Sequence, residues 1–341
     1  MGIFCKFKKN NLRRIDPRRG LFLFKGVKMY KKIKIIALIF ILMVLQGCQS
    51  VATDNTSGKA TVILSEDFGH LKTVESVKLP REETALEVTQ RIFEVKTAYN
   101  GGFVNSIDGQ VSGYTNQKRS VKKDWFYYIN GTAAVVGAGD YFIDSGDVIQ
   151  WDFHQWDNGQ YSQVIIGAYP KNFTKGYEGQ QLPIHLYSNI EKKFISKSLS
   201  KELALEKAHS ISSFDESDMD NSQRHTIIIG SWSDLKDNQG LKEILVNYKK
   251  WRLPMTIENN VLKLFSWDYS DVRSKKTGAI IVATQKSYGA LGTLWLVIAL
   301  DDASLEAAVD YLSKDSEALQ GFVGAYITKD TIVPLPIEGE K

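Results

Sequence analysis

The chain has 341 residues, 43% of them hydrophobic, a length that can support two domains. Its formal net charge is +4, but residues 1–47 hold twelve of the 43 basic residues and one of the 39 acidic residues. The other 31 basic and 38 acidic residues make the rest of the chain mildly acidic, which argues against nucleic acid as a partner.

The N-terminal segment has the pattern of a secretory signal. Three lysines precede the apolar run of residues 35–45, which is too short to span a bilayer comfortably. The run ends in Leu-Gln-Gly-Cys, which resembles the lipobox of bacterial lipoproteins and implies that residues 1–47 are removed and that Cys48 is lipidated. Met29 is a candidate for the true start, because residues 1–28 precede a complete signal. An uncleaved anchor and a plain secretory signal are the alternatives.

The segment after the signal suits a tether. Residues 48–59 are small and polar. With Cys5 removed and Cys48 lipidated, no thiol is left for a disulfide, a metal site or a nucleophile, so the fold must depend on burial of apolar side chains. We predict two domains after the tether, residues 60–170 and residues 171–341.

The first domain is predicted to consist of strands around one helix. The expected elements are a strand at 60–64, a helix at 82–98, a strand at 103–107 and two hairpins with turns at 130–131 and 145–147. The Asn-Gly pair at 130–131 is a strong signal for a type I′ turn, which needs positive φ at both central residues. This order indicates a small β-grasp-like α+β domain.

The second domain is predicted to alternate strands and helices. The expected strands lie at 182–187, 226–229, 279–283, 294–300 and 322–327, with a further strand or a hairpin at 254–267 around Asn259-Asn260. The expected helices lie at 196–209, 241–251 and 304–312, the last preceded by Asp301 and Asp302, and 214–223 is expected to be an acidic surface loop. Continuous apolar strands are typical of a sheet that is covered on both faces. We therefore expect a three-layer α/β domain with a mixed sheet.

No catalytic constellation is apparent. His154, His185, His209 and His225 are scattered and lack the spacing of metal ligands. We expect a protein that is not an enzyme and that uses no metal or cofactor of its own.

The aromatic residues of the two hairpins are the main functional signal. Trp125 and Tyr127 alternate with Phe126 and Tyr128, so one of the two sets must face the core. In the following strand Ile149, Trp151 and Phe153 form the natural core face, which leaves Trp156 on a polar face. The small residues of 133–139 would allow close approach of a ligand. The candidate ligand-binding residues are Trp125, Tyr127, Ala134, Val135, Gly137, Tyr141, His154 and Trp156. The alternative is that all the rings pack in the core or as cross-strand pairs.

These residues carry a family resemblance. The strings Asp-Trp-Phe-Tyr at 124–127, Gly-Ala-Gly-Asp-Tyr at 137–141 and Phe-His-Gln-Trp at 153–156 resemble the C-terminal β domain of intrinsic factor and transcobalamin, and related bacterial lipoprotein domains. The resemblance covers roughly residues 60–160. In those carriers this domain lies against one face of the corrin ring.

By this resemblance Tyr127 stands where the family has a corrin-contacting aromatic, Ala134 where it has an apolar loop contact, and Trp156 at the closing aromatic. The vertebrate carriers have a large helical barrel that supplies the other half of the site, whereas this chain has an α/β domain instead. Ala134 also makes a smaller contact than a longer aliphatic side chain would.

The resulting hypothesis is a lipid-anchored protein on the outer face of the cell membrane that binds a corrinoid such as cobalamin. It would hold the ring between the aromatic hairpins and the second domain and deliver it to a membrane importer, plausibly of the energy-coupling-factor type. His154 would be an axial ligand if it could reach the cobalt. One alternative is a surface interaction protein that binds a polysaccharide or a protein with the same rings. Another is a hydrolase with acids near Asp234, Asp268 or Asp271.

Overall fold

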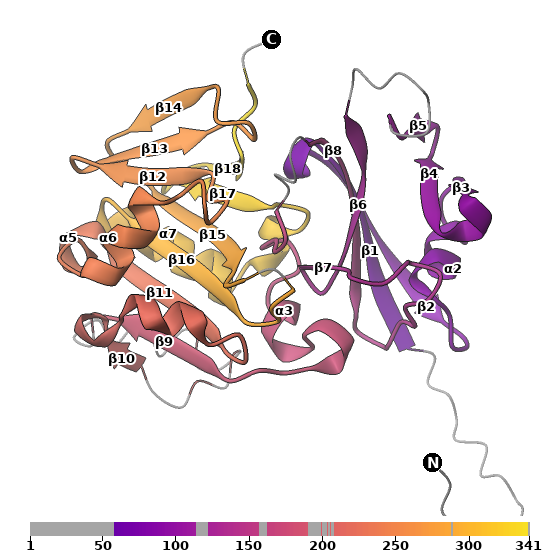
Figure 1. The fold of residues 1–341 in the computed structure, drawn as a ribbon, viewed down its shortest axis with the longest axis horizontal. Coiled ribbons are helices and arrows are strands. Elements are labelled where there is room, and N and C mark those ends of the chain that lie inside the picture. Colours follow the sequence, from indigo (N-terminus) through magenta and orange to yellow (C-terminus); the bar gives the residue numbers. More distant parts are fainter. Residues whose placement is uncertain are drawn as a thin grey trace, which may run out of the picture. The chain divides into compact units, whose positions relative to one another are not determined.

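The computed structural model describes residues 58–339, except 114–121, 157–161, 190–198, 200–202, 204, 206–207 and 288. The described residues belong to one compact unit, Asn55–Lys341, which includes both of the predicted domains. Their fold is mixed α+β, as predicted (Figure 1). Its strands form sheets in the orders β2-β1-β8-β6-β7, β10-β9-β11-β16-β15-β17-β18, β12-β13-β14 and β3-β4-β5. The predicted signal and Cys48 lie outside the described residues. None of the described helices is long and apolar enough to cross a membrane.

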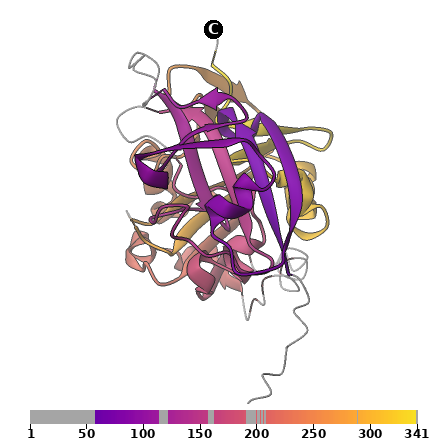
Figure 2. The same ribbon diagram turned by 90° about the vertical axis from the view of Figure 1, so that its right-hand side faces the viewer.

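The five-stranded sheet is mixed and lies in the region that was predicted as a small β-grasp-like domain. Its strands are β1 Gly58–Glu66, β2 Leu71–Leu79, β6 Lys123–Ile129, β7 Thr132–Ala133 and β8 Val148–Gln155. The central strands β1 and β8 are parallel, and each has an antiparallel neighbour, β2 and β6. Figure 2 shows these strands side by side. The Asn130-Gly131 turn has positive φ at both residues, 49° and 80°, as the sequence predicted.

The helix over this sheet is shorter than predicted. α2 spans only Ala85–Gln90 and begins with a capping box between Thr84 and Glu87. Its apolar side chains join the core of the sheet. The predicted continuation to residue 98 is wrong, because Val95–Ala98 instead forms β3, which pairs with β4 Phe103–Ile107. A third short strand, β5 Gln110–Val111, completes this small sheet.

The seven-stranded sheet is mixed, as predicted. Its strands are β9 Ile184–Ser188, β10 Ala208–Ser210, β11 His225–Ser231, β15 Ala279–Gln285, β16 Thr293–Ala299, β17 Gly324–Ile327 and β18 Ile332–Leu335. The pairs among β10, β9, β11 and β16 are parallel, and those from β16 through β15 and β17 to β18 are antiparallel. Both faces of the central strands are buried.

Different layers cover the two faces of this sheet. α7 Asp302–Ser313 packs on one face and α6 Gln239–Val246 on the other. The small sheet of β12 Met255–Glu258, β13 Val261–Phe265 and β14 Val272–Lys275 adjoins α6. The remaining described helices are α3 Lys171–Thr174, α5 Trp232–Leu235, η1 Asp67–Gly69, η2 Tyr99–Gly101, η3 Tyr177–Gly179, η4 Ile211–Ser213, η5 Glu216–Asp220 and η6 Ser316–Leu319. A three-layer arrangement results.

Several boundaries in this part differ from the predictions. The expected acidic loop at 214–223 contains η5, and its Phe214 and Met219 are buried in the core. The expected helix at 196–209 lies mostly outside the described residues, and its last positions belong to β10. The helix expected to reach residue 251 ends at Val246. The sheet continues beyond the last predicted strand, because β18, which was not predicted, pairs with β17.

Candidate functional site

The register of β6 and β8 sorts the aromatic residues onto two faces. Trp125 pairs with Phe153, and Tyr127 with Trp151, on the face that packs against α2. The paired rings lie 4.8 and 4.9 Å apart. Trp125 is 7% exposed, and its indole nitrogen donates to the carbonyl of Gln110 at 2.9 Å. Trp125 is therefore a core residue, as the alternative interpretation proposed.

The opposite face is polar but not solvated. Gln150, Asp152 and His154 are each at most 1% exposed, although their alternation with apolar residues is typical of a half-exposed strand. Trp156 belongs to this face, where its ring packs edge-on against Phe126 at 6.5 Å. Its indole nitrogen donates to Oδ2 of Asp124, a residue of β6, at 2.6 Å. The polar face that the sequence predicted for Trp156 is therefore buried along β8, and the ring has a packing partner there.

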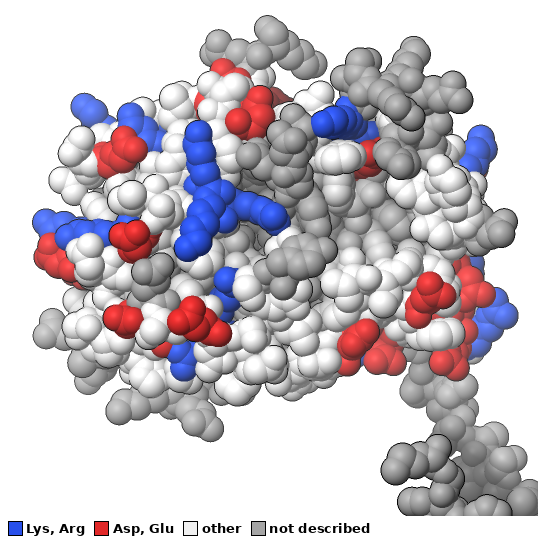
Figure 3. Space-filling view, viewed as in Figure 1, with Lys and Arg blue, Asp and Glu red and all other residues white. Residues whose placement is uncertain are grey.

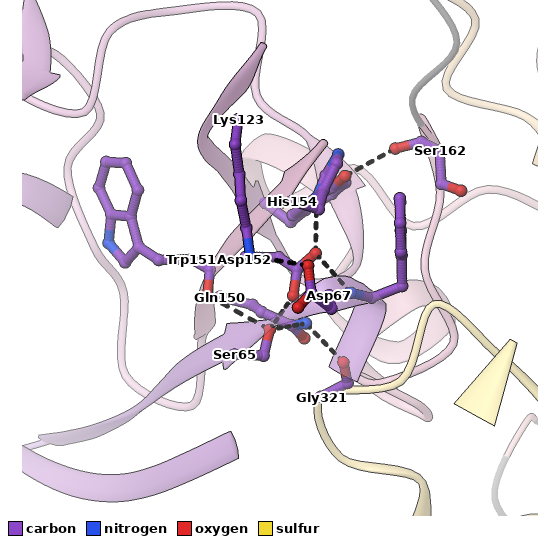
Figure 4. A network of polar contacts seen from close by, with 11 residues as sticks. Ser65, Asp67, Lys123, Gln150, Trp151, Asp152, His154, Ser162 and Gly321 are labelled. Atoms are coloured by element: carbon purple, nitrogen blue, oxygen red, sulfur yellow. Dashed lines mark hydrogen bonds and ion pairs between the residues drawn. The ribbon is translucent and has the colours of Figure 1, made fainter. Parts of the chain in front are cut away.

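A hydrogen-bond network fills this polar layer (Figure 4). The Asp152 carboxylate accepts from Ser65 Oγ at 2.6 Å, from His154 Nδ1 at 2.6 Å and from the Phe68 amide at 3.1 Å. Gln150 Nε2 donates to Ser65 Oγ at 3.0 Å and to the carbonyl of Gly321 at 2.8 Å. The network joins β1 and β8 to the loop that precedes β17. Gly321 lies in that loop, 171 residues from Gln150 in sequence.

His154 is closed to a ligand in this structure. Its side chain is fully buried and stacks between Phe68 and Phe126, with ring centroids 4.4 and 4.2 Å away. Nε2 has no hydrogen-bond partner. An Asp–His pair could orient a base or a metal ligand in principle. Nε2 is buried together with the whole side chain, so a cobalt ion has no access to it and the predicted role as an axial ligand does not fit this geometry.

A short loop after β7 exposes apolar side chains. Residues 134–137, the valine loop, carry Val135 at 72% exposure and Val136 at 38%. Phe142 is also exposed, at 58%, but it lines a different hollow, beside Leu79 and Pro80. Grouped apolar side chains on a surface indicate an interaction site more strongly than isolated ones do.

Two tyrosine hydroxyls hold the backbone of the valine loop through hydrogen bonds. The Tyr127 hydroxyl donates to the carbonyl of Val136 at 2.8 Å, and the Tyr177 hydroxyl accepts from the amide of Val135 at 3.2 Å. The ring of Tyr141 lies 5.3 Å from that of Tyr177. Burial raises the pKa of Tyr127 and of Tyr141 far above the ordinary value, so both hydroxyls remain protonated at neutral pH.

The segment that follows the valine loop is tied to the start of α2. The amide of Leu86 donates to the carbonyl of Ala138 at 2.9 Å, and the amide of Ala85 donates to the carbonyl of Tyr141 at 2.8 Å. Helix N-termini leave amides without partners inside the helix, and these two carbonyls satisfy them. The loop is thus held at its backbone while its valine side chains face outward.

The eight predicted residues therefore fall into three groups. Tyr127, Ala134, Val135, Gly137 and Tyr141 form or support the valine loop. Trp125 lies in the core, and His154 and Trp156 lie on the opposite face of the sheet. Sequence reasoning missed Val136 and Tyr177. Val136 lies in the small-residue segment already singled out, whereas Tyr177 gives no local signal.

A comparison with protein families finds a match within this region. Residues 82–155 match a domain of unknown function, DUF4430. The match contains the valine loop and the β6–β8 pair. No curated protein matches the chain in sequence.

Two solved structures resemble part of the fold. A proposed metal-binding protein from Ruminococcus gnavus ATCC 29149 has 14% identity and a TM-score of 0.24, over 29% of this chain and 99% of that protein. Haptocorrin in complex with Cbi has 15% identity and a TM-score of 0.24, over 30% of this chain and 27% of haptocorrin. At this similarity neither structure assigns a ligand to this chain. Among the described residues, no group of three or more His, Cys, Asp or Glu side chains could hold a metal ion.

Proposed function

We propose that this protein is a carrier that binds a corrinoid through the valine loop. The observation that carries the proposal is the exposure of Val135 and Val136 on a backbone held by Tyr127 and Tyr177. A loop that is already ordered loses little conformational entropy when a ligand packs on it. The loop is therefore suited to lie against the wide apolar face of a planar macrocycle.

The sequence motif supports the choice of ligand class. The resemblance to the cobalamin carriers places a ring contact at Tyr127 and a loop contact at Ala134. In this structure the ring of Tyr127 stacks on Trp151 and its hydroxyl supports the loop. The valines that follow Ala134 would then supply the apolar surface that the small alanine side chain does not. A carrier needs complementary surface and no general base.

The proposal includes a location and a destination. The lipobox-like signal would anchor the protein on the outer face of the cell membrane through Cys48. From there it would deliver the corrinoid to a membrane importer, for which an energy-coupling-factor transporter is a suitable partner. The location rests on the sequence pattern, and the destination follows from the hypothesis of a carrier.

Calorimetric titration of the full chain, purified in detergent, tests the ligand. We expect saturable one-to-one binding of cyanocobalamin. Comparison with cobinamide, which lacks the lower nucleotide, then shows whether that nucleotide contributes. No heat with either ligand would contradict the proposal and would favour the alternative of a surface interaction protein.

A matched pair of variants tests the position of the site. Val135→Ser removes apolar surface from the loop, and Val246→Ser makes the same change on α6, where the side chain is 74% exposed. Full burial of a valine side chain contributes on the order of 1.5 kcal/mol or more, so we expect about tenfold weaker binding for Val135→Ser. Val246→Ser should bind like the wild type. Equal affinities of the two variants would move the site elsewhere.

A further inference from the structure

A cleft lies away from the valine loop. It is a cleft of about 560 Å³ between η1 and the segments that follow β13 and β18. Its size falls within the range of roughly 300–1,000 Å³ that is typical of small-molecule sites. The side chains that give it its chemistry are Asp67, His70, Trp267, Asp268, Asp271 and Glu338.

The charge on the wall of the cleft is one-sided. Among the described residues, four carboxylates line it and no Lys or Arg side chain does. Lys123 offsets the charge of Asp67 at 2.8 Å, and Arg252 lies in an adjoining hollow of about 20 Å³. Asp268, Asp271 and Glu338 supply the negative charge of the other wall, where Glu338 Oε1 also lies 3.6 Å from His70 Nδ1. A cleft lined by one sign of charge concentrates ligands of the opposite sign.

Asp268 is built to stay ionised. Its Oδ1 accepts from Ser266 Oγ at 2.7 Å, from Ser270 Oγ at 2.8 Å and from the Ser270 amide at 3.1 Å. Burial alone would raise the pKa of Asp268, but these hydrogen bonds outweigh it and the pKa lies below its ordinary value. Figure 3 shows Asp and Glu side chains together near β14, while a group of Lys and Arg side chains lies lower on the same face.

An aromatic wall stands beside this carboxylate. Trp267 precedes Asp268 directly and is half-buried, with its ring packed against the cluster of Phe68, Tyr128 and Val323. A ring fixed in this way offers a face to a cation, and tryptophan is the best aromatic side chain for that contact. The cleft therefore combines a volume, an ionised acceptor and an aromatic surface.

We propose that this cleft binds a small organic cation. Its ammonium group would lie between Asp268 and Glu338, and its carbon substituents would contact Trp267. A bare metal ion is a poorer occupant, because the described residues form no metal-binding group. This site is separate from the valine loop and does not depend on the corrinoid proposal.

Titration of the full chain with choline tests the inference, with 3,3-dimethyl-1-butanol as its neutral isostere. We expect choline to bind one-to-one and at least tenfold more tightly than the isostere. The affinity for choline should fall as the salt concentration rises. The proposal would be overturned if choline binding does not saturate at millimolar concentration. It would also be overturned if choline binds no more tightly than the isostere. Displacement of choline by a neutral disaccharide would also overturn it in favour of a polyol site.

Variants locate the binding in the cleft. Asp268→Asn keeps an oxygen that can accept the serine hydrogen bonds, and Glu338→Gln changes a side chain that is 68% exposed. Both should weaken choline binding at least fivefold, and Trp267→Leu should weaken it about two- to five-fold. Asp330→Asn, an exposed acid in the turn before β18, is the control and should have no effect. If the cleft variants bind choline like the control, the assignment fails.

The two proposed sites can be told apart in the same assay. Val135→Ser should leave choline binding unchanged, and Asp268→Asn should leave corrinoid binding unchanged. Failure of the corrinoid titration alone would leave the cation site standing.

Discussion

The hydroxyl of Tyr127 supports the valine loop, and its removal is the sharpest test of that support. Tyr127→Phe keeps the ring on Trp151 at 4.9 Å and removes only the donor to the carbonyl of Val136. An intramolecular hydrogen bond contributes about 0.5–1.5 kcal/mol to stability. Because Val136 is partly exposed, water can replace the donor, and we expect the free energy of unfolding to fall by only about 0.5 kcal/mol.

The effect on ligand binding should be larger than the effect on stability. A loop that has lost one of its two side-chain anchors must be ordered again by the ligand, at about 1 kcal/mol for each residue fixed. This corresponds to an affinity that is about fivefold weaker. Denaturant unfolding and calorimetric titration with cyanocobalamin measure the two effects.

Tyr128→Phe is the matched control, because its hydroxyl also donates to a backbone carbonyl, that of Ser162, at 2.8 Å. Tyr128 lies on the opposite face of the sheet, so this change should reduce stability without changing affinity. Equal affinity of wild type and Tyr127→Phe would refute the role of the hydroxyl in holding the loop.

Two further predictions concern stability. Burial, and then the charge of Lys286, lowers the pKa of His225 to about 4 in the folded protein. The unfolded chain therefore binds a proton at this histidine near pH 6.5, a pH at which the folded protein does not. The contribution of neutral His225 to the free energy of unfolding is complete above about pH 6.5, and about 3 kcal/mol of it is lost as the pH falls towards 4. Denaturant unfolding across this range should show this loss in the wild type and a flatter profile in His225→Gln. Gly131→Ala would place a methyl group 2.0 Å from Asn172 Nδ2 at a φ of +80°, whereas Gly109→Ala has a φ of +81° and no atom within 4 Å. Both changes should cost about 1 kcal/mol of backbone strain, and Gly131→Ala about 1–3 kcal/mol more; equal melting temperatures would show that the contact relaxes freely.

The parts of the fold that sequence predicted well are set by local chemistry. The apolar runs at 279–283 and 294–300 became β15 and β16, because strands buried on both faces need continuous apolar side chains. The Asn259-Asn260 pair forms the expected turn, with φ of 51° and 59°. Asp301 accepts from the Ser304 amide at 2.9 Å and begins α7 as predicted.

The helix predicted at 82–98 shows where local patterns are ambiguous. Ile92, Phe93 and Val95 are partly buried against the same core as α2, so their apolar spacing is compatible with a longer helix. The chain instead turns back after residue 90, and β3 pairs with β4. The gain from pairing two β-prone segments outweighed the helical periodicity there.

The candidate site depends on contacts that are distant in sequence. The polar residues of β8 looked like a solvent-facing set, but Gly321 supplies a partner to Gln150 from 171 residues away. Tyr177 reaches Val135 from 42 residues away. No local sequence pattern indicates either contact. The sequence therefore indicated the residues of the valine loop, but not the tyrosine that holds its backbone or the burial of the polar face of β8.

Hydrogen–deuterium exchange with and without cyanocobalamin tests the central claim most directly. Saturating ligand should slow exchange of the amides of residues 134–137 and leave those of residues 154–156 unchanged, because residues 154–156 lie outside the valine loop and the side chains of His154 and Trp156 lie on the opposite face of the sheet. Protection confined to residues 154–156, or no protection in either segment, would contradict binding at the valine loop.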